Sequence, residues 1–201
     1  MGFLDLPIIE NRYSFDTSKV ISESGTNANV YFIDEQDDIC AKILKKEIKY
    51  SDNTLYKKIL LSDEFSARSL IRRYRFMMYV FHNGAKVPTP FGVFNLEDET
   101  GDKFPGFVAQ YDDKYLSLKS FGLEWDSFQI KDLVLEQEEL IQKMGFAVSL
   151  DFRYNENILW NPEKKDIRII DAGVWAYYGN NRDFIWSDEL SRCHNNFILL
   201  N

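Results

Sequence analysis

The sequence predicts an α+β fold of two lobes, and three observations support this. Short alternating or mostly apolar runs, which are typical of strands, lie on both sides of one strong helical stretch in the first half. The second half has another helical stretch, then a polar loop and two short strands that would form a hairpin. At 201 residues without an internal repeat, the chain is long enough for a sizeable core. We therefore expect a single domain over 1–201, with one lobe over about 1–111 and the other over about 112–201.

Four segments of the first half follow one another along the chain. Residues 18–34 read as a strand, a turn rich in Gly and Asn, and a second strand. The short, mostly apolar segment 39–44 predicts a third strand. Residues 45–62 are polar and rich in lysine, so we expect a loop there with at most a short helix. Apolar residues at helical spacing predict a helix over 63–81, with Ser62 as its N-cap.

Prolines and polar turns mark the boundaries of the later elements. Pro88 and Pro90 suit the start or edge of a strand, where no backbone N–H is needed for pairing. The segment from Asn161 to Asp166 contains Pro and charged residues, which suits the turn of a hairpin. The remaining expected elements are a strand at 87–94, a polar hairpin loop at 95–103, a strand at 107–111, a helix at 129–144 and strands at 157–160 and 167–170.

Composition and charge exclude several classes of function. The formal net charge is −8, and no basic stripe is evident, which argues against general nucleic-acid binding. The two cysteines suggest no disulfide framework, and with two histidines they make no zinc signature. No apolar run approaches the roughly 20 residues that span a bilayer, so we expect no membrane span. No secretory signal peptide is evident, so we expect a cytoplasmic protein, with delivery into a host cell by another route as the alternative.

The most informative residues lie between positions 149 and 173. Asp151 is followed by a cation, Arg153, then by Asn157 before an apolar pair, and then by Asp171 in an Asp-x-Gly sequence. Phosphoryl transfer from ATP needs such a set, because one carboxylate must lie near the acceptor hydroxyl while an amide and a second carboxylate hold Mg²⁺. Each aspartate alone could be an ordinary turn residue. Their joint occurrence, in this order and at workable spacing, favours the chemical interpretation.

The first lobe offers residues that could hold the nucleotide. Gly25, Ala28 and Val30 lie in and after a turn between two strands, where backbone N–H groups can approach phosphates. Lys42 lies in an apolar strand, where a buried cation without a partner would be costly. It could contact the α- and β-phosphates and pair with Glu64, near the start of the following helix. The alternatives are an ordinary hairpin turn, an edge-strand lysine that reaches solvent, and a glutamate that stabilises the helix dipole.

These residues resemble motifs of the protein-kinase-like superfamily over about residues 20–175. Val30 and Gly25 resemble the glycine loop, in which only the middle glycine is kept, and Asp171-Ala-Gly resembles the Asp-Phe-Gly motif. The resemblance implies an antiparallel-sheet N-lobe and an abbreviated, mainly helical C-lobe with a catalytic β-hairpin. It implies ATP and Mg²⁺ as cofactors. Asp151 would accept the proton of the acceptor hydroxyl, Arg153 would neutralise the transferring phosphate, and Asn157 and Asp171 would bind the metal.

The sequence departs from the family pattern in three ways. Ser149 takes the place of the usual His, and the spacing from Asp151 to Asn157 is one residue longer than usual. The usual spacing would put Phe152 in the catalytic place, and Arg153 is the reason to prefer Asp151. No Ala-Pro-Glu motif follows Asp171, so the chain is most similar to minimal, truncated kinases of the atypical bacterial or effector type.

Several functions fit this resemblance. The first is transfer of the γ-phosphoryl group of ATP to a hydroxyl, for which Ser or Thr of a protein partner is the preferred acceptor. A small-molecule kinase of the same superfamily is the second, and transfer of AMP also stays open. The third is a pseudokinase that binds nucleotide or acts as a scaffold. The aromatic segment 175–186 could recognise a partner, although we favour a role in the core.

Overall fold

The computed structural model describes residues 13–22, 28–34, 36–45, 47–52, 55–60, 63–148, 150–172 and 175–180, of which 22, 36, 37, 47–52, 55–60, 63–65, 150 and 151 are described by their backbone alone. The contacts among these residues divide the chain into two compact units. The described part of unit 1 comprises residues 13–74 and 91–111, and that of unit 2 comprises residues 75–90 and 112–180. The division falls within the helix α1 (Asp63–His82), after Tyr74.

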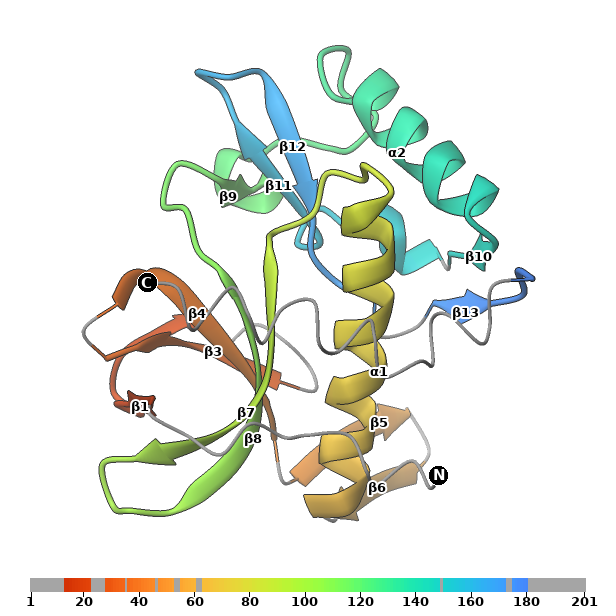
Figure 1. The fold of residues 1–201 in the computed structure, drawn as a ribbon. Helices are drawn as coiled ribbons and strands as arrows, with labels where there is room; N and C mark the ends of the chain where they lie inside the picture. Colours follow the sequence, from red (N-terminus) through yellow and green to blue (C-terminus); the bar gives the residue numbers. More distant parts are fainter. Residues whose placement is uncertain are drawn as a thin grey trace. The chain divides into compact units, whose positions relative to one another are not determined.

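A six-stranded sheet forms most of unit 1 (Figure 1). Its strands lie in the order β1-β7-β8-β4-β3-β2. The bounds of these strands are β1 Ser14–Phe15, β2 Val20–Ser22, β3 Ala28–Ile33, β4 Gln36–Leu44, β7 Pro90–Asp98 and β8 Lys103–Gln110. β1 pairs with β7 in parallel, whereas β2–β3, β3–β4 and β4–β8 are antiparallel pairs. The sheet curls, because β1 also approaches the end of β3, where the amide of Asp34 donates to the Ser14 carbonyl at 2.9 Å.

One face of this sheet carries the apolar core of unit 1. Alternate residues of a strand point to opposite faces, so the inward positions come from every second residue of β3, β4 and β7. Gly106 of β8 allows close packing here, because a Cβ atom at that position would lie 2.5 Å from Leu96 Cδ1. The buried members of this core are Phe15, Ile33, Ala41, Ile43, Phe94, Leu96 and Val108.

Residues 47–52 and 55–60 form a pair of antiparallel strands, where we expected a loop with at most a short helix. β5 (Glu47–Asp52) pairs with β6 (Leu55–Leu60) in a separate two-stranded antiparallel sheet, in register from Glu47↔Leu60 to Asp52↔Leu55. The sequence carries a weak signal for this, because Ile48 and Tyr50 alternate with polar residues. The high lysine content of the segment led us to interpret it as a loop.

The described residues of unit 2 form one complete α-helix and several short strand pairings. The bounds of its elements are β9 Leu116–Ser117, η1 Leu118–Phe121, α2 Lys131–Lys143, β10 Phe146–Ala147, η2 Leu150–Arg153, β11 Ile158–Asn161, β12 Asp166–Ile169 and β13 Ala176–Tyr177. The hairpin β11–β12 is extended by β9 into a three-stranded sheet, and β10 pairs with β13 (Figure 1). A left-handed Gly145 (φ 95°) follows α2, and a Cβ atom there would lie 2.6 Å from the Cα of Gly179.

The core of unit 2 is aromatic. Phe146 lies at its centre, with ring centroids 5.0 Å from Phe76, 4.9 Å from Tyr177 and 5.8 Å from Trp175. Trp175 is buried, as we expected for the aromatic segment, whereas Tyr178 is 70% exposed. Residues 181–186 lie outside the described residues.

The segment after α1 is joined to the rest of unit 2 by three polar contacts at one residue. The Lys86 amide donates to Gln137 Oε1 of α2 at 2.7 Å, and its carbonyl accepts the Ile169 amide of β12 at 2.8 Å. The Lys86 ammonium lies 2.7 Å from Asp166 Oδ1, and Asp166 Oδ2 also accepts the Tyr115 hydroxyl at 2.8 Å. These contacts fix the helix α2 against the β11–β12 hairpin.

The structure confirms the predicted α+β fold. The helices expected over 63–81 and 129–144 are α1 and α2, each displaced by no more than two residues at either end. In the part of the chain that the structure describes, no helix is long and apolar enough to cross a membrane.

Candidate active site

The β11–β12 hairpin places the backbones of two candidate residues at neighbouring positions. Ile158 pairs with Ile169, and both side chains are buried, so the register of the hairpin is fixed by the core. Beyond this pair, the Ile170 amide donates to the Asn157 carbonyl at 3.0 Å. Asn157 therefore lies opposite Ile170, and the residue that follows Ile170 in the chain is Asp171. Both Asn157 and Asp171 are half-buried.

The pair fits the requirements of Mg²⁺. This cation prefers oxygen ligands and is usually held by one or two carboxylates together with substrate phosphates and water. Asn157 and Asp171 offer one amide oxygen and one carboxylate from neighbouring positions. Among the described residues, no group of three His, Cys, Asp or Glu forms a metal site.

The loop that carries Asp151 begins with the 3₁₀ turn η2 and is anchored by a buried ring. Phe152 is 1% exposed, and its ring centroid lies 6.1 Å from that of Trp175. Its neighbour Asp151 lies in the same turn, and the description of Asp151 is limited to the backbone. Phe152 is therefore part of the core of unit 2, and the catalytic role of Asp151 stays a prediction.

Arg153 is engaged within unit 2. Its Nε lies 2.9 Å from Glu138 Oε2 of α2, and its guanidinium carbon lies 4.6 Å from the centre of the Trp125 ring. Glu138 and Arg153 are 15% and 35% exposed in their side chains. The ion pair and the cation–π contact hold the end of η2 against α2 and Trp125, a structural role that the sequence did not indicate.

A neighbouring segment supports the second half of this loop. The side chain of Asn155 accepts the Trp125 amide at 3.0 Å and donates to Glu124 Oε2 at 2.6 Å. The Asn155 carbonyl accepts the Lys119 amide at 3.4 Å, and the Lys119 ammonium lies 2.9 Å from Glu156 Oε1. We did not single out Asn155 from the sequence. The one signal for it was the extra residue between Asp151 and Asn157.

In unit 1, three of the predicted nucleotide-binding residues share one face of the sheet. Val30 of β3 pairs directly with Lys42 of β4, so their side chains lie on the same face. Ala28, two residues before Val30, lies on that face as well. Lys42 is half-buried and also pairs with Phe107 of β8.

Two other predicted residues are described incompletely or not at all. Gly25 lies outside the described residues. Glu64 lies in the first turn of α1, and only its backbone is described. A pairing of Glu64 with Lys42 therefore stays a prediction.

Cys40 lies two residues before Lys42, on the same face of β4. Desolvation raises the pKa of its thiol to about 12, although the Lys42 ammonium acts in the opposite direction. The thiol is therefore protonated at neutral pH.

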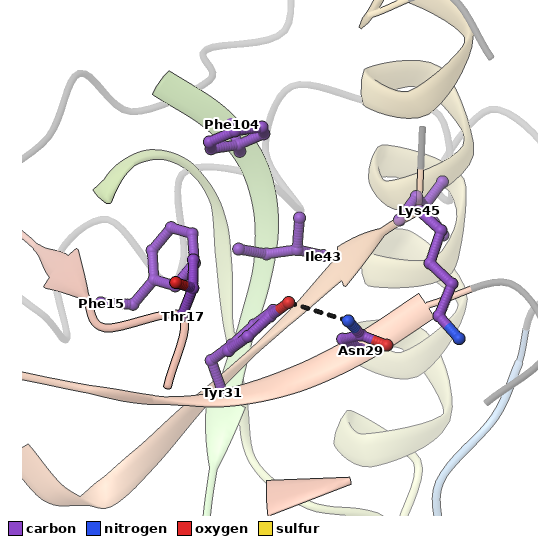
Figure 2. Close-up of a pocket in the computed structure, with 8 residues that line it drawn as sticks. Phe15, Thr17, Asn29, Tyr31, Ile43, Lys45 and Phe104 are labelled. Carbon is purple, nitrogen blue, oxygen red and sulfur yellow. Dashed lines mark hydrogen bonds between the residues drawn. The ribbon is translucent and has the colours of Figure 1, made fainter. Parts of the chain in front are cut away.

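A hollow of about 160 Å³ lies on the opposite face of the same strands (Figure 2). Asn29 and Tyr31 line it, and they alternate with Val30 along β3, so Lys42 and Val30 point away from it. Figure 2 shows the hydrogen bond from Asn29 Nδ2 to the Tyr31 hydroxyl, 2.8 Å long, within this hollow. The other lining residues are Phe15, Thr17, Ile43, Leu44, Lys45 and Phe104. Most of the lining residues thus lie on the face opposite to Val30 and Lys42, while Leu44, which pairs with Ala28, also lines the hollow.

Comparison with known proteins identifies the fold. No protein-family model and no curated protein matches the chain. The Rio2 kinase–ADP/Mg²⁺–phosphoaspartate complex from Chaetomium thermophilum matches over 92% of this chain and 55% of its own, with a TM-score of 0.53 and 17% identity. WbdD matches over 86% of this chain and 35% of its own, with a TM-score of 0.49 and 14% identity. The chain has a protein-kinase-like fold. It spans about half the length of the Rio2 chain.

The candidate residues are divided between the two units. Lys42 lies on a strand of the sheet in unit 1, whereas Asp151, Asn157 and Asp171 follow α2 in unit 2. This is the order in which the resembling motifs occur in the sequence. The likeness concerns the fold, and the roles of the individual residues are taken up below as proposals.

Proposed function

We propose that this protein is a phosphotransferase that moves the γ-phosphoryl group of Mg-ATP to a hydroxyl group. The observation that carries the proposal is the position of Asn157 beside Asp171 at the end of the β11–β12 hairpin, in a chain with a kinase-like fold. The ADP and Mg²⁺ of the Rio2 complex support ATP and Mg²⁺ as the cofactors.

Asp151 is the proposed general base in this reaction. The acceptor oxygen forms a bond to the γ-phosphorus while the bond between that phosphorus and the ADP oxygen breaks. The proton of the acceptor hydroxyl passes to the Asp151 carboxylate, and ADP leaves with the electron pair of the broken bond. The buried ring of Phe152 and the Arg153–Glu138 ion pair would keep this turn rigid.

The other candidate residues would act on the nucleotide. Mg²⁺, bound through Asn157 and Asp171, would neutralise phosphate charge. Lys42 would contact the α- and β-phosphates, with Glu64 as its partner, while Gly25, Ala28 and Val30 would lie against the nucleotide. Arg153 would contribute positive charge near the transferring phosphate, in addition to its contact with Glu138.

A Ser or Thr hydroxyl of a protein is the acceptor that we prefer. The sequence Asp-Phe-Arg at 151–153 resembles protein kinases more than small-molecule kinases. A small-molecule acceptor is the alternative. Measuring phosphoryl transfer to a mixed set of protein and metabolite acceptors would distinguish the two. The cytoplasm is the proposed location, with delivery into a host cell as the alternative.

The deciding experiment is thermal unfolding with and without Mg-ATP, for the wild type and for Asp171→Asn. A ligand at about 100 times its Kd stabilises the folded state by roughly 2.7 kcal/mol, so the wild type should melt at a higher temperature with Mg-ATP. The shift should require Mg²⁺ and be lost in Asp171→Asn, because the metal would lose a carboxylate ligand.

Asp166→Asn is the matched control, because Asp166 lies on the same hairpin and carries the same charge. Its contacts are with Lys86 and Tyr115, so its removal should lower the melting temperature while the Mg-ATP shift stays. A wild type without any shift at millimolar Mg-ATP would contradict the proposal and favour a scaffold. A shift without phosphoryl transfer to any acceptor would favour a pseudokinase.

A further inference from the structure

The loop between Asp151 and Asn157 has one residue more than the kinase motif that it resembles, and the structure shows how the loop accommodates it. After η2, the Asn157 amide turns back to the Tyr154 carbonyl at 2.8 Å. Asn155 lies within this turn, and its side chain is directed to the segment Ser117–Trp125, which we call the brace. The brace begins at β9, which pairs with β11, so it is attached to the candidate hairpin itself.

We propose that Asn155 is a positioning residue for phosphoryl transfer: by pairing with the brace, it holds Asp151 and Asn157 at their working separation. The inference rests on the function proposed above. It concerns a residue that would not touch the substrate, since the polar atoms of Asn155 are used by Lys119, Glu124 and Trp125.

The chemistry of the contacts requires an amide at this position. The Trp125 amide can only donate, and the Glu124 carboxylate, when ionised, can only accept. The Asn155 side chain meets both, accepting at 3.0 Å and donating at 2.6 Å. Aspartate could accept from Trp125 but would place a second carboxylate against Glu124. Alanine would meet neither group.

The brace is ordered well enough to act as a support. Ser117 Oγ accepts the Ser120 amide and caps η1, and the left-handed Gly122 ends it with bonds back to Leu118 and Lys119. Beyond Asn155, the brace meets the loop at two more points, the Lys119–Glu156 ion pair and the Trp125 ring under Arg153. Of these three contacts, the one made by Asn155 includes backbone atoms of both the brace and the loop.

The test compares Asn155→Ala, Asn155→Asp and the double variant Asn155→Asp with Glu124→Gln in the full chain. We would measure kcat and the KM for Mg-ATP by γ-phosphate transfer to casein and release to water, together with amide hydrogen exchange of residues 117–127. Asn155→Ala should lower kcat by about 10- to 100-fold, because a displacement of about 1 Å has effects of this size, while the KM stays within about twofold. Exchange at the amides of Lys119 and Trp125 should become faster.

The double variant is the rescue. It exchanges the carboxylate and the amide between positions 124 and 155, so the carboxylate at position 155 can accept both from the Trp125 amide and from the side-chain amide at position 124, and kcat should recover above that of Asn155→Asp alone. Lys119→Ala is the control within the brace, since it removes a pair whose side chains are 66% and 47% exposed, and kcat should stay within about twofold.

Four results would overturn the inference. Faster exchange with an unchanged kcat in Asn155→Ala would make the brace a stability element alone. Unchanged exchange in that variant would show that Asn155 does not hold the brace. A folded double variant without any recovery would contradict the pairing with Glu124. A wild type that binds no Mg-ATP or transfers no phosphate would contradict the proposed function and the positioning role together. The activity measurements give this result, whereas the exchange data alone cannot.

Discussion

The two regions that carry the candidate residues are held in place by different interactions. In unit 1, Val30 and Lys42 are positioned by the β3–β4 ladder, with an apolar core on the opposite face of the sheet. In unit 2, the turn with Asp151 and the loop that follows it are positioned mainly by side chains, through the buried Phe152, the Arg153–Glu138 pair and the amide of Asn155. A strand fixes its residues by register, whereas this loop depends on individual long-range contacts.

The largest effect on catalysis is expected for a substitution in the loop that carries Asp151. Asp151→Asn should lower kcat by about 100- to 10,000-fold, because general base catalysis contributes about that much, while Mg-ATP affinity stays nearly the same. Steady-state kinetics and nucleotide titration would measure the two effects. Asp132→Asn, an exposed residue on α2, is the control and should leave both unchanged. Retained turnover in Asp151→Asn would assign the base elsewhere.

A pair of lysines tests the ladder in unit 1. Lys42→Met should weaken nucleotide binding by about 10- to 100-fold, since a hydrogen bond to a charged group contributes about 1.5–3 kcal/mol. Lys45→Met is the matched variant, because Lys45 lines the hollow on the opposite face (Figure 2) and its loss should leave nucleotide binding intact. Calorimetric titration with Mg-ATP would separate the two. An equal loss of nucleotide affinity in both variants would contradict the prediction that the nucleotide binds on the Lys42 face of the sheet.

The smallest effect concerns the stability of the β11–β12 hairpin in acid. Burial alone would raise the pKa of Asp166, but the bonds from Lys86 and Tyr115 outweigh it and hold the pKa below its ordinary value. The ionised carboxylate therefore stabilises the fold at neutral pH, and this stability is lost as the pH falls from about 4 through the lower pKa of the folded state.

Asp166→Asn should accordingly be less stable than the wild type at pH 7, by about 1 kcal/mol for a half-exposed pair. The difference should shrink below about pH 4, where the wild-type carboxylate also becomes protonated. Urea unfolding at several pH values would measure it. A constant difference from pH 7 to pH 2 would contradict the assigned hydrogen bonds.

The sequence was sufficient for the elements with strong periodicity. The stripe of apolar residues in α1 and the apolar strands β4, β11 and β12 were predicted within a few residues of their observed bounds. The β5–β6 hairpin was missed because lysines interrupt its alternation. The two-residue strand β1 was also missed, since two residues carry no measurable period and the pairing partner lies far along the chain.

The candidate site was predictable in part, for the same physical reason. Asn157 and Asp171 were recognisable because the hairpin that joins them is local in sequence. The contacts of Asn155 with Glu124 and Trp125 join residues about 30 positions apart, and no local sequence pattern predicts such contacts. The Glu138 partner of Arg153 was hidden likewise, because a single glutamate on a polar helix face looks like any solvated residue.

The pairing of β1 with β7 has a consequence for how unit 1 folds. Ser14 meets Glu97 and Phe15 meets Asp98, so the whole of β2 to β6 and the helix α1 lie in the intervening loop. Closing a long loop lowers the conformational entropy of the chain before the new contacts stabilise it. Contacts between residues far apart in the sequence therefore form slowly. The strand β1 should therefore join after the neighbouring antiparallel pairs have formed. Until then, the apolar surface that Phe15 covers is open to other chains, which makes the late-joining strand the point where aggregation competes with folding.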